Sequence, residues 1–273
     1  MQLVAPAKIN LNFRILRRRD DGFHEIETLM APISLGDELT LERAERLTFT
    51  CDDASLPSGD DNLVLRAARS FFAEIKAEPG GRIALRKKIP HGAGLGGGSS
   101  DAASTLLGLN ELHGNSLPPE RLTKLAAEIG SDVPFFLARS AAICRGRGEI
   151  VEPVAALPAW PLLLLKPEFG VPTPWAYGRW RDSRELPGIR YAPQSLGEFT
   201  IVNDLERPVF EKYVFLAQMK EWLRAQPEVE AALLSGSGST VLAILRQQNA
   251  ADALADRARA ELDPTLWSCA ATL

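Results

Sequence analysis

The N-terminal segment alternates between apolar and polar residues, and this alternation predicts a β-strand. Every second position is apolar: Ile9, Leu11, Phe13 and Ile15. Successive side chains of a strand point to opposite faces, so one face of this strand is predicted to be buried. Three polar residues, Lys8, Asn10 and Asn12, are then expected to project together from the other face.

Similar patterns predict strands and helices along the rest of the chain. Further strands are expected at residues 26–33, 38–42, 47–51, 82–89, 162–166, 231–234, 241–245 and 267–271, with a strand pair within 141–154. Helices are expected at residues 63–77, 99–112, 120–129, 203–211 with or without continuation into 213–225, and 250–262, with a short helix from residue 133. The proline-rich stretch after residue 166 is interpreted as a connector.

The composition becomes loop-like at residues 156–161, where Pro158 and Pro161 flank a tryptophan. We place a domain boundary there, which divides the chain into residues 1–156 and 157–273. The elements after the boundary follow an order similar to βαββαβ, which is typical of a ferredoxin-like domain. The sequence therefore predicts an α+β fold with two domains.

A glycine-rich segment precedes the helix expected from residue 99. Five of the seven residues from Gly92 to Gly98 are glycine. Glycines leave backbone N–H groups free to approach a charged group, and a helix N-terminus adds unpaired donors and partial positive charge. The segment is therefore interpreted as a phosphate-binding loop. The residues expected to form it are Pro90, His91, Gly92, Ala93, Gly94, Leu95, Gly96, Gly97, Gly98, Ser99 and Ser100.

Two common phosphate-binding motifs do not fit this loop. The pattern GxGxxG matches at Gly92, Gly94 and Gly97, but a second helix, not a strand with a terminal acid, follows the first helix. A Walker A loop would end in Gly-Lys-Ser/Thr, which is absent from the sequence here. The loop is thus expected to hold phosphate through backbone amides, the helix dipole and serine hydroxyls, without its own lysine. A flexible linker is the alternative, and the apolar helix that follows argues against it.

The overall composition is that of a globular protein, with 45% hydrophobic and 24% charged residues. A net charge of −4 argues against binding to nucleic acid through a basic surface. The basic runs at 17–19 and 86–88 are interpreted as solvated surface. Three cysteines without metal-ligand spacing indicate reduced thiols, and the N-terminus lacks a signal-peptide pattern, so a cytoplasmic protein is expected. The longest apolar run, 162–165, is too short to cross a membrane.

The glycine loop resembles the second of three motifs of the GHMP kinases, the family of galacto-, homoserine, mevalonate and phosphomevalonate kinases. Residues 6–11 resemble the first motif and residues 234–239 the third, in the expected order. The likeness covers nearly the whole chain. It implies an N-terminal half similar to domain 2 of ribosomal protein S5, a ferredoxin-like C-terminal half, ATP as co-substrate and Mg²⁺ as cofactor.

Three further segments are more specific than the glycine loop: residues 21–24, 130–136 and 172–174. They resemble those members of the family that phosphorylate an alcohol on a small molecule carrying a cytidine diphosphate group, in the non-mevalonate isoprenoid pathway. The resemblance implies the same activity here, with neither nucleic acid nor membrane as a partner. The oligomeric state is left open.

Asp132 and Lys8 are the candidate catalytic residues. Asp132 lies between Gly130 and Val133-Pro134, where an aspartate that caps the next helix is equally expected from the residues alone. Lys8 is a solvated lysine at a sheet edge in the simpler interpretation. The resemblance assigns Asp132 as the base or proton acceptor. It also implies that Lys8 lies beside Asp132, where an ammonium would stabilise developing negative charge.

The remaining candidates are assigned mainly by the resemblance. Phe23 and His24 match a segment that places an aromatic ring and a histidine against cytosine, although the family usually has tyrosine at the position of Phe23. Asn10, Thr173 and Tyr177 are expected to complete the acceptor site, Tyr177 as an opposite wall or as ordinary packing. Ser99 or Ser100 is expected to reach Mg²⁺ or a phosphate oxygen, unless one of them caps the helix; we assign Ser99 to the metal.

Two alternatives remain at the level of sequence. The first is another enzyme of the same superfamily, such as a homoserine or mevalonate-type kinase. The second is a non-catalytic nucleotide or sugar sensor built on a kinase fold. A sensor is expected to have lost Lys8 or Asp132, and both are present.

Overall fold

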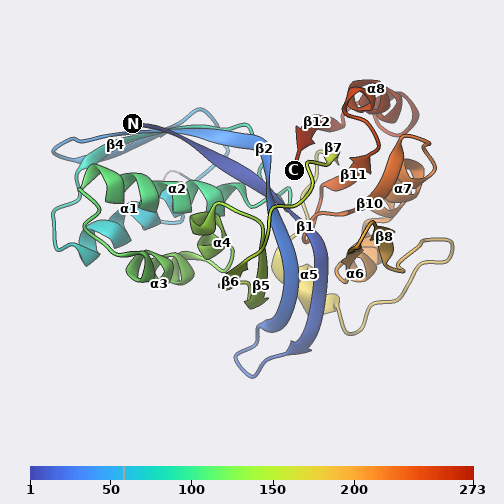
Figure 1. The fold of residues 1–273 in the computed structure, drawn as a ribbon, viewed down its shortest axis with the longest axis horizontal. Coiled ribbons are helices and arrows are strands. Elements are labelled where there is room, and N and C mark those ends of the chain that lie inside the picture. Colours follow the sequence, from blue (N-terminus) through green and yellow to red (C-terminus); the bar gives the residue numbers. More distant parts are fainter. Residues whose placement is uncertain (58) are drawn as a thin grey trace.

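The computed structural model describes residues 1–57 and 59–273, and in this part of the chain two β-sheets are covered by helices (Figure 1). The first sheet runs in the order β3 (Leu47–Cys51), β4 (Gly81–Arg86), β2 (His24–Glu42), β1 (Gln2–Arg18), β9 (Phe199–Asn203) and β8 (Gln194–Leu196). From β2 it extends to β5 (Ala142–Gly146) and then β6 (Ile150–Pro153). No helix within these residues is both long and apolar enough to cross a membrane.

A long antiparallel hairpin of β1 and β2 forms the centre of the molecule (Figure 1). The prediction of a strand is confirmed, and Ile9 and Leu11 are fully buried in the core, but Lys8 and Asn10 on the opposite face are buried as well. The prediction of two strands at 26–33 and 38–42 was wrong, because β2 continues through Gly36. A side chain at Gly36 would lie 2.6 Å from Val4 Cγ1, so glycine here lets two strands approach closely and does not mark a turn.

Four helices cover one part of the first sheet: α1 (Leu63–Glu74), α2 (Gly97–Leu112), α3 (Pro119–Ile129) and α4 (Val133–Ala138). Asn62 caps α1, because its side chain accepts hydrogen bonds from the backbone N–H groups of Val64 and Leu65. α1 ends at Glu74, earlier than the predicted residue 77. The apolar sides of these helices pack on β2 and β4, with Phe71 and Phe72 in the middle of the core.

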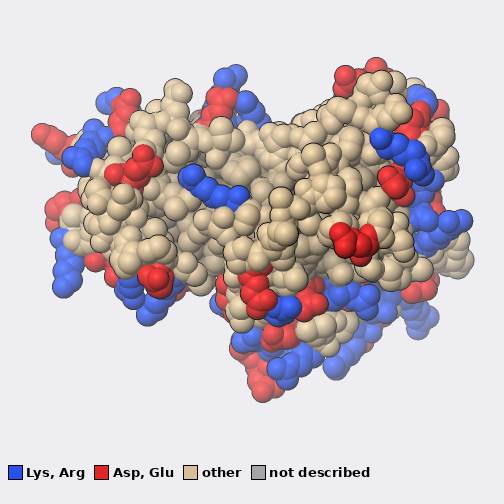
Figure 2. Space-filling view, viewed as in Figure 1, with Lys and Arg blue, Asp and Glu red and all other residues tan. Residues whose placement is uncertain are grey.

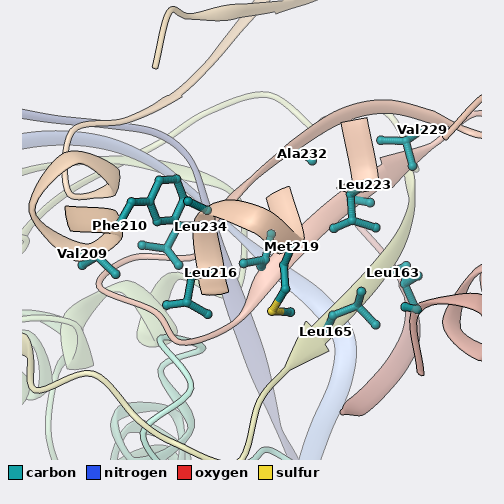
Figure 3. Packing of buried hydrophobic residues seen from close by; sticks show 14 of the residues in the cluster. Leu163, Leu165, Val209, Phe210, Leu216, Met219, Leu223, Val229, Ala232 and Leu234 are labelled. Atoms are coloured by element: carbon teal, nitrogen blue, oxygen red, sulfur yellow. The ribbon is translucent and has the colours of Figure 1, made fainter. Parts of the chain in front are cut away.

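The second sheet runs in the order β10 (Val229–Leu234), β11 (Val241–Leu245), β7 (Pro161–Lys166) and β12 (Trp267–Thr272). With α6 (Glu206–Lys212), α7 (Val214–Arg224) and α8 (Ala251–Glu261), it confirms the predicted ferredoxin-like order. One face of this sheet packs on the helices, and Figure 3 shows Leu163 and Leu165 in the same cluster as Leu216 and Met219. The other face packs on β1, which joins the two halves through a shared core.

The segment predicted as a connector contains three regular elements: α5 (Thr173–Arg179), β8 and β9. These elements are short and lie in a proline-rich segment, so they show no clear hydrophobic periodicity and were not predicted. β9 pairs with β1 in parallel, so the second half of the chain adds two strands to the first sheet. The division into residues 1–156 and 157–273 stays our proposal, with β8 and β9 as the part of the second domain that crosses to the first.

Candidate active site

One cavity of about 1180 Å³ opens between the two halves and is lined by residues from all three motifs of the resemblance: 6–11, the glycine loop and 234–239. Backbone and side-chain hydrogen bonds hold these motifs together. The N–H of Lys8 in β1 donates to the carbonyl of Leu95 at 2.9 Å, and the N–H of Thr240 donates to the carbonyl of Ala93 at 3.2 Å. The hydroxyl of Ser235 donates to the carbonyl of Gly94 at 3.1 Å. Segments far apart in sequence thus meet around the glycine loop.

The glycine loop needs glycine for steric reasons at two positions. Gly94 has φ +75°, and a side chain there would overlap the carbonyl oxygen of Ser235. Gly96 has φ +72°, and a side chain there would lie 2.9 Å from the Phe136 ring and 3.0 Å from Lys8 Cγ. The loop therefore packs against both the third motif and the lysine of the first motif.

Helix α2 begins earlier than predicted, at Gly97, with Gly96 as its N-cap residue. No side chain caps this helix, so neither Ser99 nor Ser100 has the capping role that the sequence left open. Ser99 lines the cavity. Ser100 is fully buried, and its hydroxyl has no hydrogen-bond partner among the described residues. The unpaired N–H groups of the first turn of α2 border the cavity and offer donors to an anion.

Lys8 and Asp132 meet in this cavity, with Lys8 Nζ 3.7 Å from Asp132 Oδ2. Lys8 is only 4% exposed and lies on a central strand, so the alternative of a solvated edge lysine was wrong. Its ammonium donates to Asn10 Oδ1 at 2.7 Å, and Asn10 Nδ2 donates to Thr28 Oγ1 at 2.9 Å. This chain of hydrogen bonds fixes the ammonium at the wall of the cavity.

Asp132 directly precedes α4 but does not cap it, because its side chain makes no capping hydrogen bond. The simpler interpretation of this residue, a helix-capping aspartate, was therefore wrong. Its side chain is 35% exposed, into the cavity that it shares with Lys8. A carboxylate that makes no helix-capping hydrogen bond and lies beside a fixed ammonium can accept a proton from a bound alcohol.

Aromatic side chains line the other end of the cavity, next to His24. The His24 ring lies 5.3 Å from the Tyr177 ring and 6.0 Å from the Trp180 ring, between centroids. Burial, together with the charges of Arg18 and Arg181, lowers the pKa of His24 below its ordinary value of 6.5. Its imidazole is thus neutral at pH 7 and can both donate and accept a hydrogen bond.

Burial, and then the charge of Asp132, raise the pKa of Tyr177 above its usual range, so its phenol stays protonated. Tyr177 packs on His24 and on Phe13, whose ring centroid is 6.2 Å away. Phe23 is 49% exposed, and Arg147 covers its ring at 4.9 Å from the centroid. All of these residues line the same cavity.

Charged residues of both signs are intermixed on the face shown in Figure 2, and they gather around the lower end of the molecule, where Figure 1 places the end of the β1–β2 hairpin. Of the arginines there, Arg18 lines the cavity, as do Arg147 and Arg181. Arg18 and Arg181 form no ion pair with any residue in the described part of the chain. Arg18 is exposed, as predicted for the run 17–19, and it also faces the cavity.

Thr173, at the start of α5, lines the cavity, and its hydroxyl lies 2.8 Å from that of Ser237 in the third motif. The candidates therefore surround one cavity in two groups. The loop from Pro90 to Ser99 and the Lys8–Asp132 pair lie along one part, and the group around His24, Tyr177 and Phe23 lies along another; Ser100 alone does not line it.

Several residues that build the site were missed at the level of sequence. Thr28 orients Asn10, and Trp180 packs on His24. The side-chain amide of Asn203 donates to the carbonyls of Leu234 and Gly236 at 2.8 and 2.7 Å, which anchors the third glycine turn to β9. The signal for Thr28 was its polarity between Ile26 and Met30, the apolar residues two positions before and after it. For Asn203 the sequence held no comparable signal, because its partners are backbone carbonyls.

The donor set of the cavity bears on the Mg²⁺ that the resemblance implies. Within residues 1–57 and 59–273 there is no group of three or more His, Cys, Asp or Glu side chains that could hold a metal ion. Mg²⁺ usually keeps several waters and binds one or two protein oxygens together with substrate phosphates. The Ser99 hydroxyl at the start of α2, beside the glycine loop, fits that mode.

Comparisons with known proteins agree with this geometry. Residues 62–140 match the GHMP kinases N terminal domain, and residues 194–263 match the GHMP kinases C terminal domain. The 4-diphosphocytidyl-2-C-methyl-D-erythritol kinase of Methylacidiphilum infernorum is 44% identical over 269 residues, which cover 96% of this chain and 93% of the relative. The enzyme of the same name from Geobacter metallireducens is 38% identical, with 92% and 91% covered.

Solved structures extend the comparison to the fold. A crystal structure of 4-(cytidine 5'-diphospho)-2C-methyl-D-erythritol kinase matches with a TM-score of 0.80 at 38% identity, over 100% of this chain and 98% of that one. The mevalonate kinase of Methanococcus jannaschii, at 13% identity and a TM-score of 0.64, matches over 99% and 97% and shares the fold. The chain belongs to the GHMP kinases and, within them, to the family of 4-diphosphocytidyl-2-C-methyl-D-erythritol kinases.

Proposed function

We propose that this protein transfers the γ-phosphate of ATP to the 2-hydroxyl of 4-diphosphocytidyl-2-C-methyl-D-erythritol, giving the 2-phosphate and ADP in the non-mevalonate isoprenoid pathway. One observation carries the proposal: the Lys8–Asp132 pair lies in a single cavity with the glycine loop and with the aromatic group around His24. Membership of the kinase family supports the same chemistry and substrate.

The donor is held by the glycine loop in this proposal. Backbone N–H groups from His91 to Ser99, which include the N-terminus of α2, receive the polyphosphate without a lysine inside the loop. Ser99 would hold Mg²⁺, which would neutralise charge on the polyphosphate when bound. The protein contributes a fixed cradle, so the terminal phosphate is aimed toward the Lys8–Asp132 pair.

Asp132 accepts the proton of the acceptor hydroxyl while the hydroxyl oxygen attacks the γ-phosphorus of ATP. The attack is in line with the bond to the leaving ADP. Lys8 stabilises the negative charge that develops on the attacking oxygen. Its ammonium is already held by Asn10, so little reorganisation is needed when this charge appears. The pair thus supplies proton transfer and charge stabilisation from two different segments of the chain.

The acceptor is recognised at the aromatic end of the cavity. A neutral His24 can bond the polar edge of cytosine, and Phe23 and Tyr177 provide aromatic surface for the base. Stacking survives the replacement of tyrosine by Phe23, whereas any contact of a hydroxyl is lost. Asn10 and Thr173 lie nearer the sugar alcohol in this arrangement, and the arginines at this end suit a diphosphate.

A panel of alcohol acceptors with labelled ATP tests the proposal. We expect label to appear on 4-diphosphocytidyl-2-C-methyl-D-erythritol and not on mevalonate, homoserine or galactose. Label on mevalonate or homoserine alone would assign the protein to another branch of the superfamily. Binding of ATP with no acceptor phosphorylated would favour a nucleotide sensor.

Replacement of His24 by alanine is expected to affect the acceptor and not the nucleotide. Loss of a hydrogen bond inside the cavity should raise the KM of the acceptor by about tenfold or more, while the KM of ATP changes less than about twofold. His113→Ala is the matched control, since His113 packs on Phe71 and Phe72 away from the cavity. Equal rises in both KM values for His24→Ala would mean a structural role for this histidine.

The cytoplasm as the location stays a prediction. It rests on the three cysteines, which form no disulfide.

A further inference from the structure

Lys87 departs from the prediction that the run Arg86-Lys87-Lys88 is solvated. Its side chain is only 9% exposed and lines the cavity beneath the glycine loop. Its ammonium bonds the carboxylate of Asp37 and, at 2.8 Å, the carboxylate of Asp101. Lys88, the next residue, is different, because its side chain is 46% exposed and pairs with Glu38 at the surface.

The two carboxylates belong to different parts of the site. Asp37 lies on β2 and is fully buried, and it also accepts the backbone N–H groups of Lys88 at 2.6 Å and Ile89 at 2.8 Å. It therefore fastens the segment that leads into the glycine loop. Asp101 lies in the second turn of α2, directly after the loop, and is 2% exposed.

The Lys87–Asp101 ion pair thus joins a residue three positions before the loop to the residue directly after it, 14 positions apart. Between them the backbone adopts positive φ at Gly92, Gly94 and Gly96. A glycine-rich segment has many accessible conformations, so ordering it on binding costs affinity unless it is already fixed. The ammonium also lies 3.3 Å from the position that a side chain at Gly97 would take, directly under the start of α2.

We propose that Lys87, Asp37 and Asp101 form a buried tie that closes the base of the glycine loop and preorganises it for nucleotide, with Lys87 and Asp101 as positioning residues. The proposal rests on the proposed use of ATP. Lys87 lies outside the loop and takes the place of the lysine that the loop itself lacks. It braces the loop and does not bind phosphate.

Cutting the tie on the α2 side is the direct test. Asp101→Ala leaves the Lys87–Asp37 pair intact, so no buried charge loses its last partner. We expect the dissociation constant of Mg-ADP, measured by calorimetry, to rise by about tenfold, which is about 1.4 kcal/mol. The KM of the acceptor should change less than twofold. Unchanged binding of Mg-ADP would overturn the proposal, even if the melting temperature falls.

Asp101→Asn is the conservative variant that should rescue binding, because its amide oxygen can still accept a hydrogen bond from Lys87. Burial raises the pKa of Asp101 to about 7, against the attraction of Lys87, so a neutral side chain is tolerated at this position. We expect Mg-ADP to bind Asp101→Asn within about threefold of the unmodified protein. Binding as weak as that of Asp101→Ala would contradict a hydrogen-bonded tie.

Lys87→Met and Lys88→Met form a matched pair of neighbours. Lys87→Met should weaken Mg-ADP at least as much as Asp101→Ala, and Lys88→Met should leave binding and turnover unchanged. If Lys87→Met does not fold, the two Asp101 variants still decide the question. Failure of this inference is distinct from failure of the proposed function, which the unmodified protein tests in the acceptor panel.

Discussion

Asp132→Asn is expected to lower kcat by about 10²–10⁴-fold, the usual range for loss of general acid–base help and equivalent to about 3–5 kcal/mol in the barrier. The change keeps the size of the side chain and removes its ability to accept a proton. Because Asp132 makes no capping bond to α4, the fold should be little affected. Steady-state kinetics with both substrates, together with calorimetry of Mg-ADP, measure the effect.

A second carboxylate of the same cavity provides the control for Asp132. Asp182 lines the cavity at its aromatic end and forms no ion pair in the described part of the chain. We expect Asp182→Asn to keep kcat within about threefold and Asp132→Asn to bind Mg-ADP normally. Turnover of Asp132→Asn close to that of the unmodified protein would remove this residue from the mechanism.

Gly94→Ala is expected to be the most damaging single methyl group in the glycine loop. An L-residue at φ +75° costs about 1–2 kcal/mol, and a side chain there would overlap the Ser235 carbonyl and lie 2.9 Å from that of Gly238. Adding about 1–3 kcal/mol for overpacking gives a loss of roughly 2–5 kcal/mol in the free energy of unfolding. Denaturant unfolding measures this loss, and the KM of ATP should rise because the loop must move.

Gly92→Ala separates the two causes of destabilisation by Gly94→Ala, which are the positive φ and the steric overlap of the new side chain. Gly92 also has positive φ, +64°, but a side chain there would meet its nearest atom at 3.9 Å. It should therefore show only the conformational cost of about 1–2 kcal/mol. Equal destabilisation by the two alanines would show that close packing between the glycine loop and the third motif contributes nothing.

Elements with a clear hydrophobic pattern were predictable from the sequence, whereas the points at which strands continue or break were not. β11 at 241–245 and the order of the ferredoxin-like half follow from apolar runs between turn residues. β2 was predicted as two strands because a glycine in a strand and a glycine in a turn give the same local signal, and only the close approach of Val4 to Gly36 decides between them. The segment predicted as a connector before residue 203 contains α5 and β9, which the sequence did not predict. β9 pairs with β1, which lies far away in sequence.

The site was predictable where backbone geometry or the family resemblance assigned residues. The glycine loop required both positive φ and close packing, and its glycines report these needs directly. The meeting of Lys8 and Asp132 depends on tertiary structure, so the residues alone left a solvated lysine and a capping aspartate open. Lys87 could not be separated from Lys88 by sequence, because its burial depends on Asp37 and Asp101.

The central claim is that donor and acceptor meet at the Lys8–Asp132 pair. A crystal structure with a non-hydrolysable ATP analogue and 4-diphosphocytidyl-2-C-methyl-D-erythritol tests it most directly. We predict that the terminal phosphate lies on the glycine loop and that the 2-hydroxyl of the acceptor lies within hydrogen-bond distance of Asp132 and in line with that phosphate. An acceptor bound with its 2-hydroxyl away from both Lys8 and Asp132 would contradict the account.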